Sequence, residues 1–243
     1  MEAEGAAGWD ASAEAWIARV DSGDPERKIL LDSVVLELCG DVGGLTALDV
    51  GCAEGRFSRM LAARGAKVTG FDPCRALIKA AAARHPEGTY VLASAEAIPF
   101  ATATFDLAVC YLVLIDVTDF RRAIQEMARV LKPGGRLVVA NLVSFRPAVS
   151  TGWIRDAEAC RLHIVVDDDY FAERANHAAW CGISVTNFHR PAEAYFTAFI
   201  NAGLRLAAYR EPHMTFERLA EHPDFETEAR MPVFNAMAWL RAV

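Results

Sequence analysis

The chain has 243 residues, a formal net charge of −7 and a hydrophobic fraction of 53%. This length and apolar content can bury one substantial core, so we expect a single domain over residues 1–243. The acidic balance and the lack of Lys/Arg clusters argue against a nucleic acid partner, because neutralising phosphates requires grouped cations. No apolar run reaches the about 18 residues of a membrane span, and the acidic start lacks a signal-peptide pattern. We therefore expect no membrane contact and a cytoplasmic location.

Six cysteines are spread along the chain, and none of them form a C-x-x-C pair. Most lie in apolar surroundings, which is typical of small core residues in a reducing compartment. We therefore predict no metal site. The sequence leaves the oligomeric state open between a monomer and a homodimer.

The first 44 residues follow a helical pattern. Trp9, Ala13 and Trp16 recur at helical spacing, and a second apolar stripe covers about residues 26–38. From residue 45 the pattern changes to short apolar runs that alternate with amphipathic segments. The expected strands cover 46–50, 67–71, 90–92, 105–110 and 136–141, and the expected helices cover 56–63, 75–84 and 120–131. Strands that alternate with helices predict a mainly parallel sheet with both faces covered.

Residues 144–190 interrupt this alternation. The segment is rich in aromatic residues and histidine, which favours an insertion packed over a binding site. A helix then opens at Pro191 and closes at Gly203. Strands expected at 204–209 and 233–240 would pair antiparallel. The predicted fold class is therefore α/β, a doubly wound, seven-stranded, mostly parallel sheet with an antiparallel last strand.

The first loop of this sheet is Asp49-Val-Gly51-Cys-Ala53-Glu-Gly55. Ligands of open α/β sheets bind at the carboxyl ends of the strands. Glycines let the backbone turn tightly and approach a ligand, and the helix that follows offers free N–H groups to a carboxylate. An acid ahead of the first glycine can meet a cationic amine. The loop therefore suits a zwitterionic amino-acid group.

Asp72 ends the second expected strand. An acid at this place can accept both hydroxyls of a ribose. The alternative is that Asp72, just ahead of Pro73, caps the next helix.

Three further motifs follow in order: Ala93-Ser-Ala-Glu-Ala-Ile-Pro-Phe100, the strand that starts Phe105-Asp, and Leu131-Lys-Pro-Gly-Gly135. Together with the first loop and Asp72, they resemble the motifs of class I S-adenosylmethionine (SAM) dependent methyltransferases. The resemblance is strongest to the small-molecule group related to quinone biosynthesis, the methyltransferase type 11 family. It covers roughly residues 9–240 and implies a Rossmann-like fold with SAM as cofactor.

The resemblance also divides the chain. Residues 1–44 correspond to a helical lid, 45–143 to the cofactor-binding core, 144–190 to a substrate-capping insertion, and 191–243 to the C-terminal helix and strands. The first loop would bind the methionine part, Asp72 the ribose, and the stretch after the third strand the adenine. An arginine of the lid would meet the SAM carboxylate. The implied cofactor contacts are Arg27, Asp49, Gly51, Cys52, Ala53, Gly55, Phe57, Asp72, Pro73, Ser94, Ala95, Glu96 and Tyr111.

Three positions depart from the family pattern. Ala53 stands where the family usually has glycine, which adds a methyl group near the cofactor. Ser94 stands where the family usually has an adenine-contacting aspartate, and Ile115 stands where many relatives have a histidine. A catalytically weak or inactive SAM-binding protein is therefore an alternative. A nicotinamide-dependent oxidoreductase is less favoured, because the loop lacks the Gly-x-Gly-x-x-Gly spacing.

Methyl transfer from a sulfonium is an in-line displacement, so the protein must align the two reactants and exclude water. An alcohol, phenol or ammonium nucleophile also needs a proton acceptor. The candidates are His189, His163 and Asp116, each with a purely structural alternative. We predict O-methylation of a small apolar or aromatic molecule. Its expected contacts are Trp16, Tyr111, Trp153, Tyr170 and Trp180.

Overall fold

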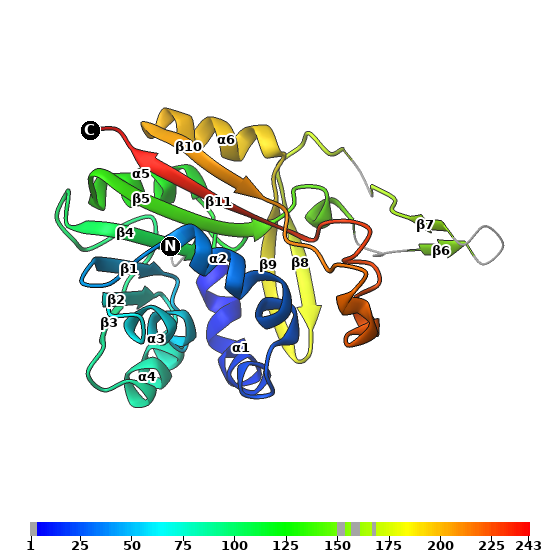
Figure 1. Cartoon of the computed structure of the whole chain (residues 1–243), viewed down its shortest axis with the longest axis horizontal. Helices are drawn as coiled ribbons and strands as arrows, with labels where there is room; N and C mark the ends of the chain where they lie inside the picture. Colours follow the sequence, from blue (N-terminus) through cyan, green and yellow to red (C-terminus); the bar gives the residue numbers. More distant parts are fainter. Residues whose placement is uncertain (1–3, 150–153, 157–160, 167–168) are drawn as a thin grey trace.

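The computed structural model describes residues 4–149, 154–156, 161–166 and 169–243. Its centre is a seven-stranded sheet in the order β10-β11-β5-β4-β1-β2-β3 (Figure 1). Strands β1 to β5 of this sheet pair in parallel, and β11 runs antiparallel to both β5 and β10. This arrangement confirms the predicted fold class. The bounds are β1 Thr46–Val50, β2 Lys67–Asp72, β3 Thr89–Leu92, β4 Phe105–Tyr111, β5 Leu131–Leu142, β10 Leu204–Arg210 and β11 Phe234–Arg241.

Helices cover both faces of the sheet. Helices α5 (Phe120–Val130) and α6 (Ala192–Asn201) pack on one face, and α2 (Asp32–Cys39) and α3 (Arg56–Ala62) pack on the other (Figure 1). Helix α4 (Arg75–Arg84) packs on β2 and β3. This covering explains why β1 and β4 are nearly continuous apolar runs. In the described part of the chain, none of the helices is both long and apolar enough to cross a membrane.

The N-terminal segment departs from the two helices expected there. Helix α1 extends over Glu4–Asp21. The second expected helix is divided, because a π-helical turn over Arg27–Leu31 precedes α2. Such turns are rare and often lie at functional sites. This one carries Arg27, a predicted cofactor residue.

The start of β5 also differs from the expectation. The strand begins at Leu131, directly after α5, whereas the glycine pair at 134 and 135 predicted a start at 136. The register with β4 shifts between Phe105 and Leu107, next to this segment. Proline cannot donate to a sheet ladder, and an irregularity of this kind accommodates Pro133 inside a strand.

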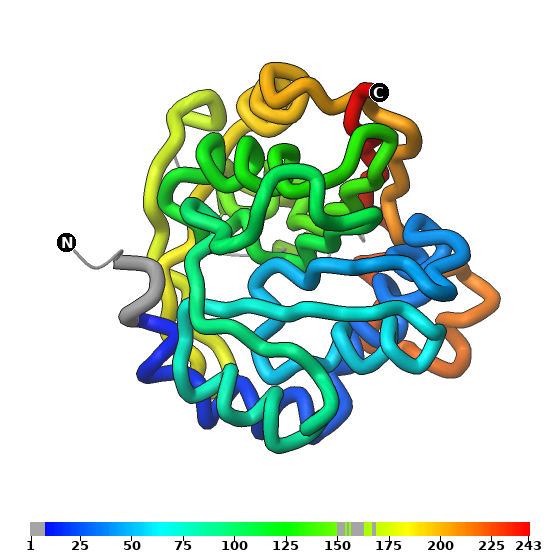
Figure 2. Tube along the Cα trace, turned by 90° about the vertical axis from the view of Figure 1, so that its left-hand side faces the viewer, coloured from blue at the N-terminus to red at the C-terminus, as the bar shows by residue number. Residues whose placement is uncertain are grey.

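The insertion contains two antiparallel pairs of strands, which the sequence did not predict. These are β6 (Ile154–Asp156) with β7 (Arg161–His163), and β8 (Arg174–Trp180) with β9 (Ile183–His189). The β6–β7 pair projects from the body in Figure 1, whereas α1 lies along the β8–β9 hairpin in Figure 2. Ser12 of α1 accepts a 3.0 Å bond from the Ser184 N–H and donates a 3.1 Å bond to the Ser184 carbonyl. The N-terminal lid and the β8–β9 hairpin of the insertion therefore pack together as one unit.

Candidate active site

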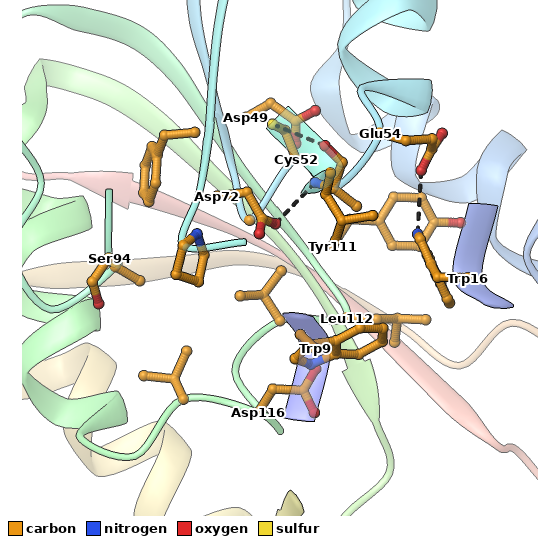
Figure 3. Close-up of a pocket in the computed structure, with 18 of the residues that line it drawn as sticks. Trp9, Trp16, Asp49, Cys52, Glu54, Asp72, Ser94, Tyr111, Leu112 and Asp116 are labelled. Carbon is orange, nitrogen blue, oxygen red and sulfur yellow. Dashed lines mark hydrogen bonds between the residues drawn. The ribbon is translucent and has the colours of Figure 1, made fainter. Parts of the chain in front are cut away.

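A cavity of about 590 Å³ lies at the carboxyl edge of the sheet, where β1, β2 and β4 end (Figure 3). Its volume is typical of small-molecule sites. The structure brings most of the predicted site residues together in its lining. These are Trp16, Arg27, Asp49, Gly51, Cys52, Ala53, Phe57, Asp72, Pro73, Ser94, Ala95, Glu96, Tyr111 and Asp116.

The first loop reaches the cavity through a series of left-handed residues. Gly51 has a φ of 65°, Ala53 of 49° and Gly55 of 79°. A Cβ atom on Gly51 would lie 2.5 Å from a methyl carbon of Val113, so this position requires glycine. Ala53 adopts a conformation that alanine rarely takes, which is a physical reason for the glycine of the family pattern.

Gly55 does not line the cavity, so its predicted cofactor contact is not supported. It is instead the N-cap residue of α3. A Cβ atom there would lie 3.0 Å from the Tyr90 hydroxyl and 3.1 Å from the Ala81 methyl group. Gly55 therefore serves the turn and the packing beneath the loop.

Asp49 is buried at the end of β1, with 1% of its surface exposed. The Ser58 hydroxyl donates a 2.6 Å hydrogen bond to its carboxylate. Burial raises the Asp49 pKa to about 7, although the bond from Ser58 acts in the opposite direction. A carboxylate held in this way is ready to pair with a cationic group in the cavity.

Asp72 is buried at the end of β2. It accepts hydrogen bonds from the backbone N–H groups of Ala53, at 3.0 Å, and Cys74, at 2.8 Å. Burial raises its pKa to about 6, against the lowering effect of these two bonds. The N-cap residue of α4 is Cys74, not Asp72, so the carboxylate supports the loop and faces the cavity without capping the helix itself.

The lid closes over one side of this cavity. The Trp16 indole N–H donates a 3.2 Å bond to Glu54, and the Arg27 guanidinium lies 4.5 Å from the Trp16 ring centroid. The Trp9 and Trp16 rings meet edge to face at 5.3 Å. Glu54, which the sequence reasoning missed, is 1% exposed and joins loop to lid. Its only sequence signal was its place between Ala53 and Gly55.

Tyr111 ends β4 and lines the cavity with its ring. Its hydroxyl donates a 2.8 Å bond to Asp32, which also accepts bonds of 2.6 and 2.9 Å from the Arg56 guanidinium. The Phe57 ring packs edge to face against Tyr111 at 5.1 Å. Burial raises the Tyr111 pKa, and the nearby Asp32 carboxylate adds to this effect. The Tyr111 side chain is therefore an uncharged part of the cavity lining that is held in one position.

Asp116 is the predicted base that reaches the cavity. It follows β4, is half-buried, and accepts a hydrogen bond from the Asn187 side chain. Loss of contact with bulk water raises its pKa to about 8, and the bond from Asn187 opposes this shift. An acid with this pKa can exchange a proton near neutral pH.

Neither predicted histidine base lines the cavity. His189 is 0% exposed, and its Nε2 pairs with the Tyr170 carbonyl oxygen at 2.7 Å. Its ring is packed inside the fold, 5.5 Å from the Tyr170 ring between centroids. His163 is exposed on β7, with Nε2 3.9 Å from Asp156. Both predictions of a base therefore lack support from position.

The predicted aromatic wall is only partly present. Trp180 lies outside the lining, and Tyr170 lines a separate cavity of about 180 Å³ beside α6. Trp153 lies outside the described residues. The sequence reasoning also left out of the site several residues of the lid and of the loop after β4. These are Asp10, Leu112, Val113, Val117 and Thr118, and Trp9 lines the cavity as well.

Comparisons with known proteins agree with this site. Residues 48–139 match a family described as a methyltransferase domain. The chain is 31% identical over 198 residues to the O-methyltransferase cnsE of Penicillium expansum. This match covers 75% of this chain and 71% of that protein. It is 35% identical over 114 residues, 47% of the chain, to the demethylmenaquinone methyltransferase of Renibacterium salmoninarum, but spans only 46% of that relative's length.

A solved structure gives the same result. The S-adenosylmethionine dependent methyltransferase of Mesorhizobium loti superposes with a TM-score of 0.78 at 26% identity, covering 86% of this chain and 96% of that one. The lining fits the cationic cofactor: buried Asp49 and Asp72 face the cavity, and Gly51 leaves room for close approach. SAM is therefore its cofactor, and the chain belongs to the class I SAM-dependent methyltransferases.

Proposed function

We propose that this protein transfers a methyl group from SAM to an oxygen atom of a small, neutral, apolar or aromatic molecule, with Asp116 as the proton acceptor. One observation carries the proposal. Of the three predicted bases, all within the described residues, Asp116 alone lines the cavity. The proposal agrees with the name O-methyltransferase that the Penicillium expansum relative bears.

The cofactor would lie along the ends of β1, β2 and β3. Asp49 and Arg27 would hold the amino and carboxylate groups of its methionine part, and Asp72 the ribose hydroxyls. The adenine would lie near Ser94. Bound SAM supplies a methyl group on a positively charged sulfur.

The acceptor would then occupy the part of the cavity that remains, beside Trp9, Leu112 and Asp116 (Figure 3). A hydroxyl group placed there can give its proton to the Asp116 carboxylate as its oxygen attacks. Trp9 and Trp16 cover this end and exclude water, which keeps the reactants aligned.

The charge of the lining favours a neutral acceptor over a carboxylate. Among the described lining residues, the acids are Asp10, Asp49, Glu54, Asp72, Glu96 and Asp116, and the cations are Arg27 and Arg56. Arg56 pairs with Asp32, and Arg27, which pairs with Asp24, would also be engaged by the carboxylate of SAM. An acceptor carboxylate would meet a like charge in the ionised Asp116 that the proposed proton transfer requires.

The test is a screen for S-adenosylhomocysteine release with sets of phenols, alcohols, amines and carboxylic acids matched in ring size. We expect phenols or alcohols to react, and Asp116→Asn to slow their turnover at least tenfold while SAM affinity changes less than twofold. Preferred methylation of carboxylic acids, with normal turnover by Asp116→Asn, would contradict the proposal. SAM binding without turnover of any acceptor would indicate an inactive binding protein.

A further inference from the structure

The loop that carries Asp116 is held from outside the core, by the strand β9 of the insertion. We propose that Asn187 on β9 is a positioning residue for Asp116, and that Arg190 braces the same loop. This inference rests on the proposed function, because it assigns a task to the residues around the proposed proton acceptor. It gives the insertion a part in the chemistry besides that of a cover.

Asn187 contacts Asp116 directly. Its side-chain amide donates a hydrogen bond to Oδ1 of the carboxylate. The backbone reinforces this contact, since the N–H of Phe188 donates a 2.7 Å bond to the carbonyl of Ile115. Two successive residues of β9 thus hold two successive residues of the loop. One carboxylate oxygen is occupied by Asn187, which fixes how the other is presented.

Arg190 holds the loop on both sides of Asp116. Its guanidinium donates bonds of 2.8, 2.6 and 3.1 Å to the carbonyl oxygens of Leu114, Val117 and Thr118. The side chain is 3% exposed and lies between the Phe120 and Phe188 rings, 4.4 and 4.5 Å from their centroids. Burying a cation is costly, and here the three carbonyl bonds offset that cost together with the Glu173 carboxylate, which lies 4.0 Å from Arg190 Nε.

The groups around Asp116 determine how the Asp116 pKa changes when the Asn187 side chain is removed. The charged groups that influence the carboxylate are Asp72 at the end of β2 and Arg190 after β9, and Trp9 of α1 contributes a neutral hydrogen bond. The bond from Asn187 favours the ionised carboxylate. Removing this bond should therefore raise the Asp116 pKa, whereas a purely structural asparagine would leave it unchanged.

The experiment is a pH titration of the Asp116 carboxyl carbon by NMR in the full chain labelled with ¹³C-aspartate, with Asp116→Asn to assign the signal. We expect Asn187→Ala to raise the Asp116 pKa by about one unit, since a hydrogen bond to a charged group has roughly this effect. The isosteric Asn187→Asp, which places an acid in the same space, should raise it further. The latter variant also keeps the test valid if the alanine variant does not fold.

Asn176→Ala is the matched control. Asn176 pairs with Asn187 across the β8–β9 hairpin, but its side chain donates to the Pro147 carbonyl at 2.6 Å. It should leave the Asp116 pKa unchanged. An Asp116 pKa that is the same in wild type, Asn187→Ala and Asn187→Asp would overturn the inference.

Turnover measurements distinguish a failure of this inference from a failure of the proposed function. With an acceptor found in the screen, we expect Asn187→Ala to shift the pH dependence of kcat/KM in the same direction as the NMR pKa. The affinity for SAM should stay the same. If Asp116→Asn stops turnover but Asn187→Ala moves neither quantity, the inference fails and the proposed function stands. If Asp116→Asn leaves turnover intact, the base assignment fails, and the positioning of Asp116 fails with it.

Discussion

The backbone N–H of Ala53 donates a 3.0 Å hydrogen bond to the carboxylate of Asp72, so the first loop is tied to the end of β2 across the floor of the cavity. The second oxygen of Asp72 accepts a 2.8 Å bond from the Cys74 N–H. The two bonds fix the carboxylate before any ligand arrives. Groups that are held in place in this way bind with less loss of conformational freedom.

Replacing Asp72 tests its assigned contact with the ribose. Asp72→Ala removes the acceptor and leaves the N–H groups of Ala53 and Cys74 unpaired, so we expect SAM to bind at least tenfold more weakly, about 1.4 kcal/mol or more. Calorimetry measures this change. The exposed Asp224→Ala is the control and should bind like wild type. Equal affinity of the Asp72 variant and wild type, with circular dichroism showing intact folding, would rule out the ribose contact.

Replacing Ala53 with glycine should make the folded protein more stable. Its φ of 49° costs an alanine roughly 1–2 kcal/mol, and the greater freedom of glycine in the unfolded chain offsets about 0.4–1 kcal/mol. We expect Ala53→Gly to raise the free energy of unfolding by up to about 1 kcal/mol in urea denaturation. Ala82→Gly, on an exposed position of α4, should lower it by about 1 kcal/mol. A loss of the same size in both variants would show that Ala53 is unstrained.

The buried acids predict a particular pH dependence. Burial raises the pKa of Asp49 to about 7 and of Asp72 to about 6, from an ordinary value of 3.8. The folded chain therefore holds these protons more tightly than the unfolded chain. Their contribution to stability is full below about pH 4 and is lost as the pH rises through 6 and 7. SAM affinity should change in the opposite direction, because the ionised carboxylates attract a cation.

Asp49→Asn isolates this effect, because the amide stays neutral at every pH. Between pH 5 and pH 8, the Tm of this variant without ligand should fall less than that of wild type. Differential scanning calorimetry at a series of pH values gives the comparison. Identical slopes for the two proteins would mean that Asp49 ionises freely in the folded state.

The hydroxyl of Tyr111 holds this side chain in place in the cavity lining. Tyr111→Phe keeps the ring but removes the bond to Asp32, which is buried and bound to Arg56, so we expect a loss of about 1–2 kcal/mol in stability. SAM affinity should change little. Tyr209→Phe removes a similar bond, of 3.1 Å to the exposed Glu211, and should cost less than about 0.5 kcal/mol. Losses of equal size would show that the buried network adds nothing.

The sequence predicted the core of the fold because local patterns decide it there. The first loop, Asp72 and the ends of β1, β2 and β4 follow one another in a short stretch, and their apolar runs define the strands. The insertion was harder. Its contacts join distant residues, such as Asn187 with Asp116 and Ser12 with Ser184, and no local pattern encodes them. The direction in which a histidine points, as for His189, depends on that packing as well.

The central claim is tested most directly by calorimetric titration of the folded, wild-type chain with SAM and, separately, with NADH. We expect saturable binding of one SAM per chain and no binding of NADH, because Asp49 and Asp72 lie in a cavity that suits a cationic amino-acid nucleoside. No binding of SAM at millimolar concentration would contradict the account.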